Sequence, residues 1–391
     1  MAEGRGRYRV RVLVAPDSFG STLTAVEAGA AIAAGWERTA PDDRLTVTAM
    51  SDGGPGFVDV LYDALGGELL GVTVSGPAGG PVPATVLLVD RPDHRAAYLE
   101  CAQACGLPLR PAGADPEALT TVGVGELLAT AIDAGARTVV IGLGGSATTD
   151  GGAGLLAALG ATGDPPGALT GGPAGLARLT AVDVGPARAR TAGITLLAAT
   201  DVDNPLLGLR GAANVFGPQK GLAADRLRPV DETLGAYAAL VEGRGSADAA
   251  RAGIGSRTAV RQGAGAAGGL GFALLALGGE RVAGITTVAE AVGTAAALRE
   301  ADLVLTGEGA FDYSSRSGKV VSGVAGLAGE AGVPCVVLAG RVDLGAREMR
   351  TMGVESAYGM TTLVGEQAAL GDPAGSLSAL AERVARTWSR R

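Results

Sequence analysis

Six acidic residues stand at the ends of predicted strands or inside glycine-rich loops, where catalytic and metal-binding carboxylates are often found. They are Asp17, Asp52, Asp150, Asp201, Glu308 and Asp312. The carboxyl ends of strands in an open parallel sheet converge on one crevice. Carboxylates gathered there suit Mg²⁺, which takes one or two of them together with phosphate oxygens, and a general base that accepts a hydroxyl proton. Each acid taken alone could equally be a turn or helix-capping residue.

The chain keeps two lysines, and both lie in glycine-flanked loops. Lys220 follows Gly217-Pro218-Gln219, and Lys319 follows Ser317-Gly318, whereas all other members of the 32 Lys and Arg residues are arginine. A compact ammonium reaches a phosphate oxygen as a point charge in a narrow loop, which the planar fork of arginine does less well. The two lysines are therefore candidates for phosphate contacts, with a biased amino-acid composition as the alternative explanation.

A glycine-rich loop follows the predicted strand Thr138–Leu143. Its start at Gly142 fits the G-x-G-x-x-A dinucleotide pattern, but no acid ends the next strand, because Asp164 lies in a Gly-Asp-Pro-Pro loop. The chain also lacks the P-loop pattern G-x-x-x-x-G-K-[ST]. Convergent backbone N–H groups and a helix N-terminus make the loop a candidate anion cradle. A tight strand-to-helix turn is the alternative. The expected nucleotide-binding residues are Gly144, Gly145, Ser146, Thr148 and Asp150.

A third polar group follows the predicted strand Ile194–Thr200. It combines an acid, an amide and an ammonium, namely Asp201, Asn204 and Lys220. Such groups can position a phosphoryl donor and an acceptor hydroxyl. The single histidine, His94, lies in a polar hairpin turn, so a Ser–His triad is not expected.

Strands and helices alternate at both ends of the chain, which predicts one doubly wound α/β domain that is discontinuous in sequence. Its strands are expected at Val10–Ala15, Leu45–Met50, Ala301–Thr306 and Cys335–Ala339. The fold class is therefore α/β with two α/β domains. Residues 1–68 and 285–391 form a Rossmann- or flavodoxin-like domain, and residues 69–284 form a second α/β domain that carries the glycine-rich loop.

The second domain is expected to open with an antiparallel meander, because three short β runs follow one another with Gly/Pro turns and no helix between them. These runs are Leu69–Ser75, Ala84–Val89 and Ala96–Ala102. Further along, Gly163–Gly175 is expected to be a loop, and Gly265–Leu277 a helix with a glycine-rich first turn.

Composition excludes several classes of protein. The 391-residue chain has a net charge of −8, which argues against a nucleic-acid or anionic-membrane partner. The 65 glycines are expected to bring backbone close to a ligand. Three cysteines without metal-ligand spacing are expected to be buried thiols. Neither a signal peptide nor a long apolar run is predicted, so we expect a cytoplasmic protein that acts on a small molecule.

Seven motifs occur in order along nearly the whole chain, and as a set they resemble the bacterial class I glycerate kinase family. They are Ala15–Phe19, Ser51–Gly54, Gly142–Gly154, Asp201–Leu206, Phe216–Gly221, Gly263–Gly271 and Thr306–Lys319. The resemblance implies a two-domain α/β kinase with its active site in a cleft between the domains. It also implies that ATP and Mg²⁺ are used to phosphorylate a hydroxyl of glycerate or a related polyol. A homodimer is left open.

The resemblance also suggests roles. Asp201 is expected to be the general base or a Mg²⁺ ligand, Asp52 a second metal ligand, and Lys220 the charge on the transferring phosphoryl group. Acceptor binding is expected from Asp17, Ser18, Asn204, Glu308, Asp312 and Lys319.

Some positions depart from the family pattern. Gly20 stands where the family has lysine, Ala310 where it has arginine, and Pro55 where it has glutamate. Losing two charged partners would weaken glycerate binding by roughly 10²–10⁴-fold. A kinase with a changed acceptor, such as a neutral polyol, a cyclitol or a cyclitol phosphate, is therefore one alternative, and an inactive ligand-binding homologue is another. Arg316 or Arg341 could instead supply a relocated cation and keep glycerate as the acceptor.

Overall fold

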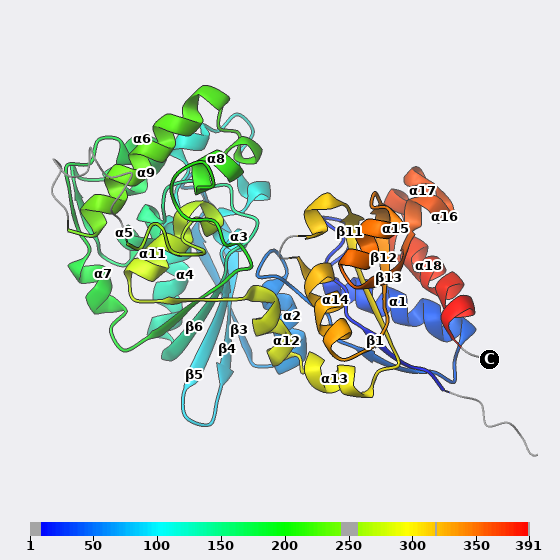
Figure 1. Cartoon of the computed structure of the whole chain (residues 1–391). Coiled ribbons are helices and arrows are strands. Elements are labelled where there is room, and N and C mark those ends of the chain that lie inside the picture. The colour runs from blue at the N-terminus through cyan, green and yellow to red at the C-terminus, as the bar shows by residue number, and fades with distance from the viewer. Residues whose placement is uncertain (1–8, 244–256, 317–318, 390–391) are drawn as a thin grey trace, which may run out of the picture. The chain divides into compact units, whose positions relative to one another are not determined.

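The computed structural model describes residues 9–243, 257–316 and 319–389 (Figure 1). The chain divides into two compact units. Unit 1 comprises residues 1–52, 59–65 and 285–391, and unit 2 comprises residues 53–58 and 66–284. The predicted domain boundaries differ from these units mainly at residues 53–58, which pack with unit 2.

Unit 1 is built on a parallel sheet of five strands within the described residues, in the order β13-β12-β11-β1-β2. Reading from the other edge, this is the 2-1-3-4-5 order of flavodoxin-like folds, and the strand order reverses between β1 and β11. The Rossmann- or flavodoxin-like α/β prediction is therefore confirmed for this unit. The strands are β1 (Arg11–Val14), β2 (Arg44–Val47), β11 (Leu303–Phe311), β12 (Cys335–Val342) and β13 (Val354–Gly359).

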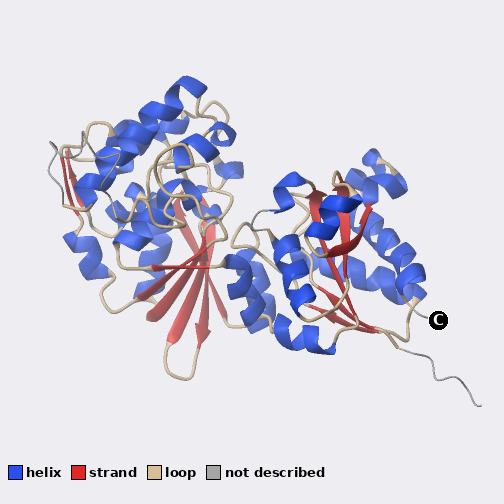
Figure 2. Cartoon of the chain, in the orientation of Figure 1, coloured by secondary structure: helices blue, strands red, loops and turns tan. Residues whose placement is uncertain are grey.

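Helices cover this sheet (Figure 2). The face that carries Val12, Val14 and Leu305 forms one buried cluster with apolar side chains of α1 and α18. Helix α1 starts sharply because Thr24 and Glu27 form a reciprocal capping box. The helices are α1 (Ala25–Thr39), α2 (Phe57–Leu65), α12 (Gly284–Ala291), α13 (Thr294–Glu300), α14 (Val320–Glu330), α15 (Ala346–Thr351), α16 (Met360–Val364), α17 (Glu366–Gly371) and α18 (Pro373–Trp388).

Unit 2 contains a mixed sheet in the order β10-β9-β6-β5-β4-β3. The antiparallel meander predicted for the start of this domain is β3 to β5, and β5, β6, β9 and β10 run parallel. The strands are β3 (Glu68–Ser75), β4 (Pro81–Asp90), β5 (Arg95–Glu100), β6 (Ala136–Gly142), β9 (Thr195–Ala199) and β10 (Glu280–Val282), with β7 (Thr162–Asp164) and β8 (Ala181–Asp183) as a separate pair.

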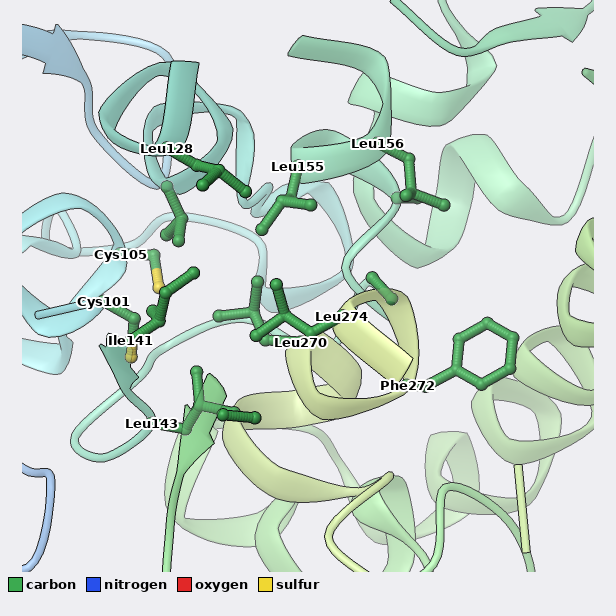
Figure 3. Close-up of a cluster of buried hydrophobic side chains, with 14 of the residues drawn as sticks. Cys101, Cys105, Leu128, Ile141, Leu143, Leu155, Leu156, Leu270, Phe272 and Leu274 are labelled. Carbon is green, nitrogen blue, oxygen red and sulfur yellow. The ribbon is translucent and has the colours of Figure 1, made fainter. Parts of the chain in front are cut away.

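The core of unit 2 lies between this sheet and its helices. Figure 3 shows Ile141 and Leu143 in one buried apolar cluster with Leu128, Leu155 and Leu270, which come from different helices. The helices are α3 (Ala102–Cys105), α4 (Val122–Asp133), α5 (Ala153–Ala158), α6 (Gly172–Leu176), α7 (Gly185–Arg190), α8 (Ala212–Phe216), α9 (Leu227–Val241) and α11 (Leu270–Ala276). None of the helices in the described part of the chain is long and apolar enough to cross a membrane.

The predicted bounds of the following three elements were wrong. Strand β11 continues five residues beyond the predicted end at Thr306, to Phe311, because β12 pairs with it along this stretch. The predicted loop Gly163–Gly175 contains part of β7 and most of α6. Helix α11 begins at Leu270, since Ala267 and Gly268 have positive φ angles that interrupt a regular helix.

Candidate active site

The flavodoxin-like sheet places Asp17 at its topological switch point. The backbone N–H of Asp17 donates to the carbonyl of Gly307 (2.8 Å), and that of Met50 donates to the carbonyl of Pro16 (2.9 Å). These bonds hold the segments that follow β1 and β2 next to each other and beside the middle of β11. Ser18 lies beside Asp17, and its N–H donates to Oδ1 of that carboxylate (2.7 Å).

Three of the predicted acids of unit 1 influence one another. Burial, reinforced by the negative charges of Asp52 and Glu308, raises the pKa of Asp17 to about 8. Carboxylates that repel one another in this way are suited to share a proton or a cation. The structure therefore brings Asp17, Asp52 and Glu308 into one electrostatic group, as their sequence positions predicted.

Glu308 is buried within strand β11, and burial raises its pKa. Its Oε2 lies 3.6 Å from Nζ of Lys319. Among the described residues its other oxygen, Oε1, has no hydrogen-bond partner. A buried acceptor without a partner costs free energy, so this oxygen is available for a hydroxyl group of a ligand.

Asp312 and Lys319 lie close to Glu308, and a serine missed by sequence reasoning links them. Ser314 donates from its N–H (2.8 Å) and its Oγ (2.7 Å) to Oδ1 of Asp312, and these bonds lower the pKa of that carboxyl. The same Oγ accepts a hydrogen bond from Nζ of Lys319 (2.8 Å). Ser314 was not among the predicted site residues.

The positions that lack the family's cations are also in unit 1. Gly20 is exposed with a φ of +61°, and a Cβ there would meet nothing within 4 Å. Ala310 is half-buried in β11. Arg341, one of the two predicted replacements, has Nη2 3.7 Å from Oδ2 of Asp312. The side chain of Arg316 lies outside the described part of the structure.

In unit 2, Asp150 anchors the glycine loop from inside. This loop, residues 144–150, follows β6. Asp150 is completely buried, and its carboxylate accepts hydrogen bonds from N–H (2.9 Å) and Oγ1 (2.8 Å) of Thr121 and from N–H of Gly152 (3.0 Å) and Gly154 (3.2 Å). Burial raises its pKa. These contacts make Asp150 a support of the loop, and its expected contact with a nucleotide stays a prediction.

Lys220 lies directly under the glycine loop. Its Nζ donates to Oγ of Ser146 (2.8 Å) and to the carbonyl of Thr148 (2.7 Å). The residue is only 3% exposed, and this burial lowers the pKa of the ammonium to about 8, against the opposing effects of Cys105, Cys101 and Asp150. The structure thus brings the predicted lysine and the predicted loop together.

Thr148 lies inside the glycine loop, and its expected contact with a nucleotide stays a prediction. The residue is fully buried, and among the described residues its Oγ1 has no hydrogen-bond partner. Its carbonyl, by contrast, is bound by Lys220. The backbone of Thr148 is therefore the part that shapes the loop.

Glycines around this loop allow backbone segments to touch one another. A Cβ on Gly144 would lie 2.5 Å from Cα of Gly54, and one on Gly268 would meet the carbonyl of Thr148 and lie 3.0 Å from Nζ of Lys220. Several glycines expected to approach a ligand thus serve contact between loops. The glycine-rich segments 53–56, 144–152 and 263–271 therefore pack against one another in unit 2.

Asp201 and Asn204 follow β9 at the same end of the unit 2 sheet as the glycine loop follows β6. Asp201 is half-buried. The side-chain amide of Asn204 donates to the carbonyl of Arg210 (2.8 Å), and its backbone carbonyl accepts from the N–H of Gly265 (2.9 Å). Asn204 therefore shapes its own loop, and its contact with an acceptor stays a prediction.

The predicted metal ligands belong to separate units, Asp52 to unit 1 and Asp201 to unit 2. Within the described residues, no three His, Cys, Asp or Glu side chains are grouped so that they could hold a metal ion. Mg²⁺ in phosphoryl-transfer enzymes is bound by one or two carboxylates and by substrate phosphates, so its protein ligands are not expected to form such a group.

Acids at a flavodoxin-type switch point, together with a buried ammonium under a glycine loop, define an α/β phosphotransferase. The chain belongs to the glycerate kinase family, whose model matches residues 12–389. Members of this family transfer phosphate to an alcohol group.

Two curated relatives and one solved structure illustrate the similarity. Glycerate kinase of Bacillus subtilis is 38% identical over 353 residues, covering 89% of this chain and 90% of that protein. Glycerate 2-kinase of Escherichia coli is 36% identical over 360 residues, covering 91% and 92%. A crystal structure described as glycerate kinase 2 from Salmonella typhimurium LT2 has a TM-score of 0.77 at 35% identity, covering 97% of this chain and 98% of that chain.

Proposed function

We propose that this protein transfers the terminal phosphoryl group of ATP to a hydroxyl of glycerate, with Mg²⁺ as cofactor. The observation that carries the proposal is the Lys220 ammonium, held under a glycine loop in a chain that matches the glycerate kinase family along nearly its whole length. The relatives named above act, by their names, on glycerate. They give no support to a changed acceptor or to an inactive homologue.

Unit 2 would hold the nucleotide. The loop at Gly144 and Gly145 offers backbone N–H groups to phosphate oxygens, and the hydroxyl of Ser146 adds a further donor. Lys220 fixes the loop through Ser146 and the Thr148 carbonyl, and it would place a positive charge beneath the phosphates. This charge would stabilise the phosphoryl group during transfer, as electrostatic preorganisation requires.

Unit 1 would hold the acceptor. Oε1 of Glu308 would accept a hydrogen bond from a substrate hydroxyl. The predicted substrate-binding residues Ser18 and Lys319 belong to the same unit. We assign Asp201 as the general base or as a Mg²⁺ ligand, and Asp52 as a second ligand. Bound Mg²⁺ would neutralise charge on the transferring phosphate.

The test measures ATP-dependent phosphorylation of glycerate and of a panel of neutral polyols and cyclitols. We expect glycerate to be the preferred acceptor by kcat/KM. Asp201→Asn should reduce kcat by about 10²–10⁴-fold, the range for loss of general acid–base catalysis. The control is Asp203→Asn, an exposed neighbour that is ion-paired with Arg281 (2.8 Å) and is expected to leave kcat unchanged.

Two results would contradict the proposal. Preference for a polyol over glycerate would revive the changed acceptor, and no phosphorylation of any acceptor would favour an inactive homologue. The cytoplasmic location and the homodimer stay predictions.

A further inference from the structure

Arg341 stands beside the position where the family pattern has its arginine. In the parallel pairing of β11 with β12, Arg341 is the partner of Ala310, and Ala339 is the partner of Glu308. Registered residues on neighbouring strands project from the same face of a sheet and are about 4.8 Å apart. The side chain of Arg341 therefore leaves the sheet on the same face as the Glu308 carboxylate, next to the methyl group of Ala310.

The backbone next to Ala310 packs closely against Gly20, the other position where the family pattern has a cation. A Cβ on Gly309 would lie 3.3 Å from the backbone nitrogen of Gly20, and one on Gly340 would meet the carbonyl of Gly309. Gly20 therefore packs over the face of β11 opposite to Ala310, since successive residues of a strand point to opposite faces. On the face that Ala310 and Arg341 share, Ala310 contributes only a methyl group, which leaves room there for the long side chain of Arg341.

The charges of Arg341 are only loosely paired. Its Nη2 lies 3.7 Å from Oδ2 of Asp312, its Nη1 lies 3.2 Å from Oδ2 of Asp343, and its side chain is 57% exposed. Exposed ion pairs of this length contribute little to stability, so a ligand carboxylate can compete for the guanidinium. Lys319 is less available, because its Nζ is already bonded to Ser314 and close to Glu308.

We propose that Arg341 binds the carboxylate of the acceptor and so makes the enzyme specific for a hydroxy acid. The inference rests on the function proposed above. The planar guanidinium can bind a carboxylate through two parallel hydrogen bonds, which a neutral polyol cannot accept in the same way. The cation that the sequence lacks at position 310 is then supplied from the neighbouring strand.

The experiment compares glycerate with glyceramide, its neutral amide, as acceptors for the wild type and for Arg341→Ala, Arg341→Lys and the double variant Ala310→Arg/Arg341→Ala. We expect Arg341→Ala to raise KM for glycerate about 10–100-fold, the effect of one charge-assisted contact, with KM for ATP and turnover of glyceramide unchanged. Arg341→Lys should be intermediate, and Ala310→Arg should restore part of the lost affinity.

The matched control is Arg11→Ala. Arg11 lies on β1 of the same sheet, its side chain is 48% exposed, and it is ion-paired with Asp302 (2.7 Å). It should leave all kinetic constants unchanged, and thermal unfolding would verify that each variant is folded. Normal KM for glycerate in Arg341→Ala, or an equal loss with glyceramide, would overturn the role of Arg341 while glycerate kinase activity stands. A wild type that does not phosphorylate glycerate would overturn the proposed function and this inference together.

Discussion

Replacing Lys220 by methionine tests whether the ammonium under the glycine loop is held there at a cost to stability. Burial lowers the pKa of Lys220 from its ordinary value of 10.5 to about 8. Below pH 8 the folded and unfolded states both carry the proton, and the folded state holds it in an unfavourable place. Between about pH 8 and 10.5 the folded state has released this proton and the unfolded state has not. Stability should therefore rise with pH across this window.

The size of the effect follows from the two pKa values. One pKa unit corresponds to about 1.4 kcal/mol, so burial of the charged lysine costs about 3 kcal/mol at neutral pH. Most of this, roughly 2–3 kcal/mol, should be recovered between pH 7 and pH 10, and the rest remains because the unfolded state is still mostly protonated at the upper limit. Methionine fills a similar volume and does not titrate, so its variant should lack this gain.

The assay is urea unfolding of both proteins at several pH values from 7 to 10. Titratable groups other than Lys220 are common to both proteins, so most of their effect cancels in the difference. We expect the free energy of unfolding of the wild type to gain roughly 2–3 kcal/mol on that of Lys220→Met as the pH rises. The variant should also lose kinase activity at every pH. Two curves that stay parallel would refute the reasoning, because they would mean that the lysine has an ordinary pKa.

Three further predictions concern the packing around the glycine loop and around the two lysines. Gly268→Ala should lower the free energy of unfolding by more than about 3 kcal/mol, because the new Cβ would meet the carbonyl of Thr148 in the loop. The control is Gly278→Ala, which also has a positive φ but lies in open space, and it should cost only about 1–2 kcal/mol. Asp150→Asn should cost about 2–4 kcal/mol, since its amide would face backbone donors; a loss under 1 kcal/mol would contradict its anchoring role. Lys220→Arg should lower the free energy of unfolding by about 1–3 kcal/mol through overpacking, whereas Lys319→Arg should be tolerated because Lys319 is only half-buried. Chemical unfolding measures both losses. Equal losses would contradict the difference in space around the two lysines.

The α/β fold could be predicted from the sequence because its signals are local. Apolar runs such as Val10–Ala15 end in polar turns, and helices such as α1 begin at capping residues that are visible in the sequence. The flavodoxin-like order of strands could not be fixed among the doubly wound alternatives, because it depends on which strands pair. The pairing of β1 with β11 joins segments nearly 300 residues apart in the sequence.

The extent of β11 shows where local signals failed. Gly307 and Gly309 flank Glu308, and glycine is depleted in strands, so a loop was expected there. In the structure, β12 pairs with this stretch, and a Cβ on Gly307 or Gly340 would meet a backbone carbonyl of the neighbouring strand. The glycines are needed for the close approach of strands, so tertiary contacts override the local preference. This places Glu308 in a rigid strand, which suits a residue that must hold a ligand accurately.

The two lysines, alike in the sequence, differ in how much space surrounds them in the structure. Around Lys220 the ammonium is bonded to Ser146 and Thr148, and the backbone of Gly268 closes over it, so a guanidinium has no room. Lys319 is more exposed, and its surroundings could accommodate a larger cation. Composition therefore drew attention to both residues, but steric exclusion of arginine applies only to Lys220. Retention of Lys319 must depend on its contacts with Ser314 and Glu308, or on a ligand, and space alone does not explain it.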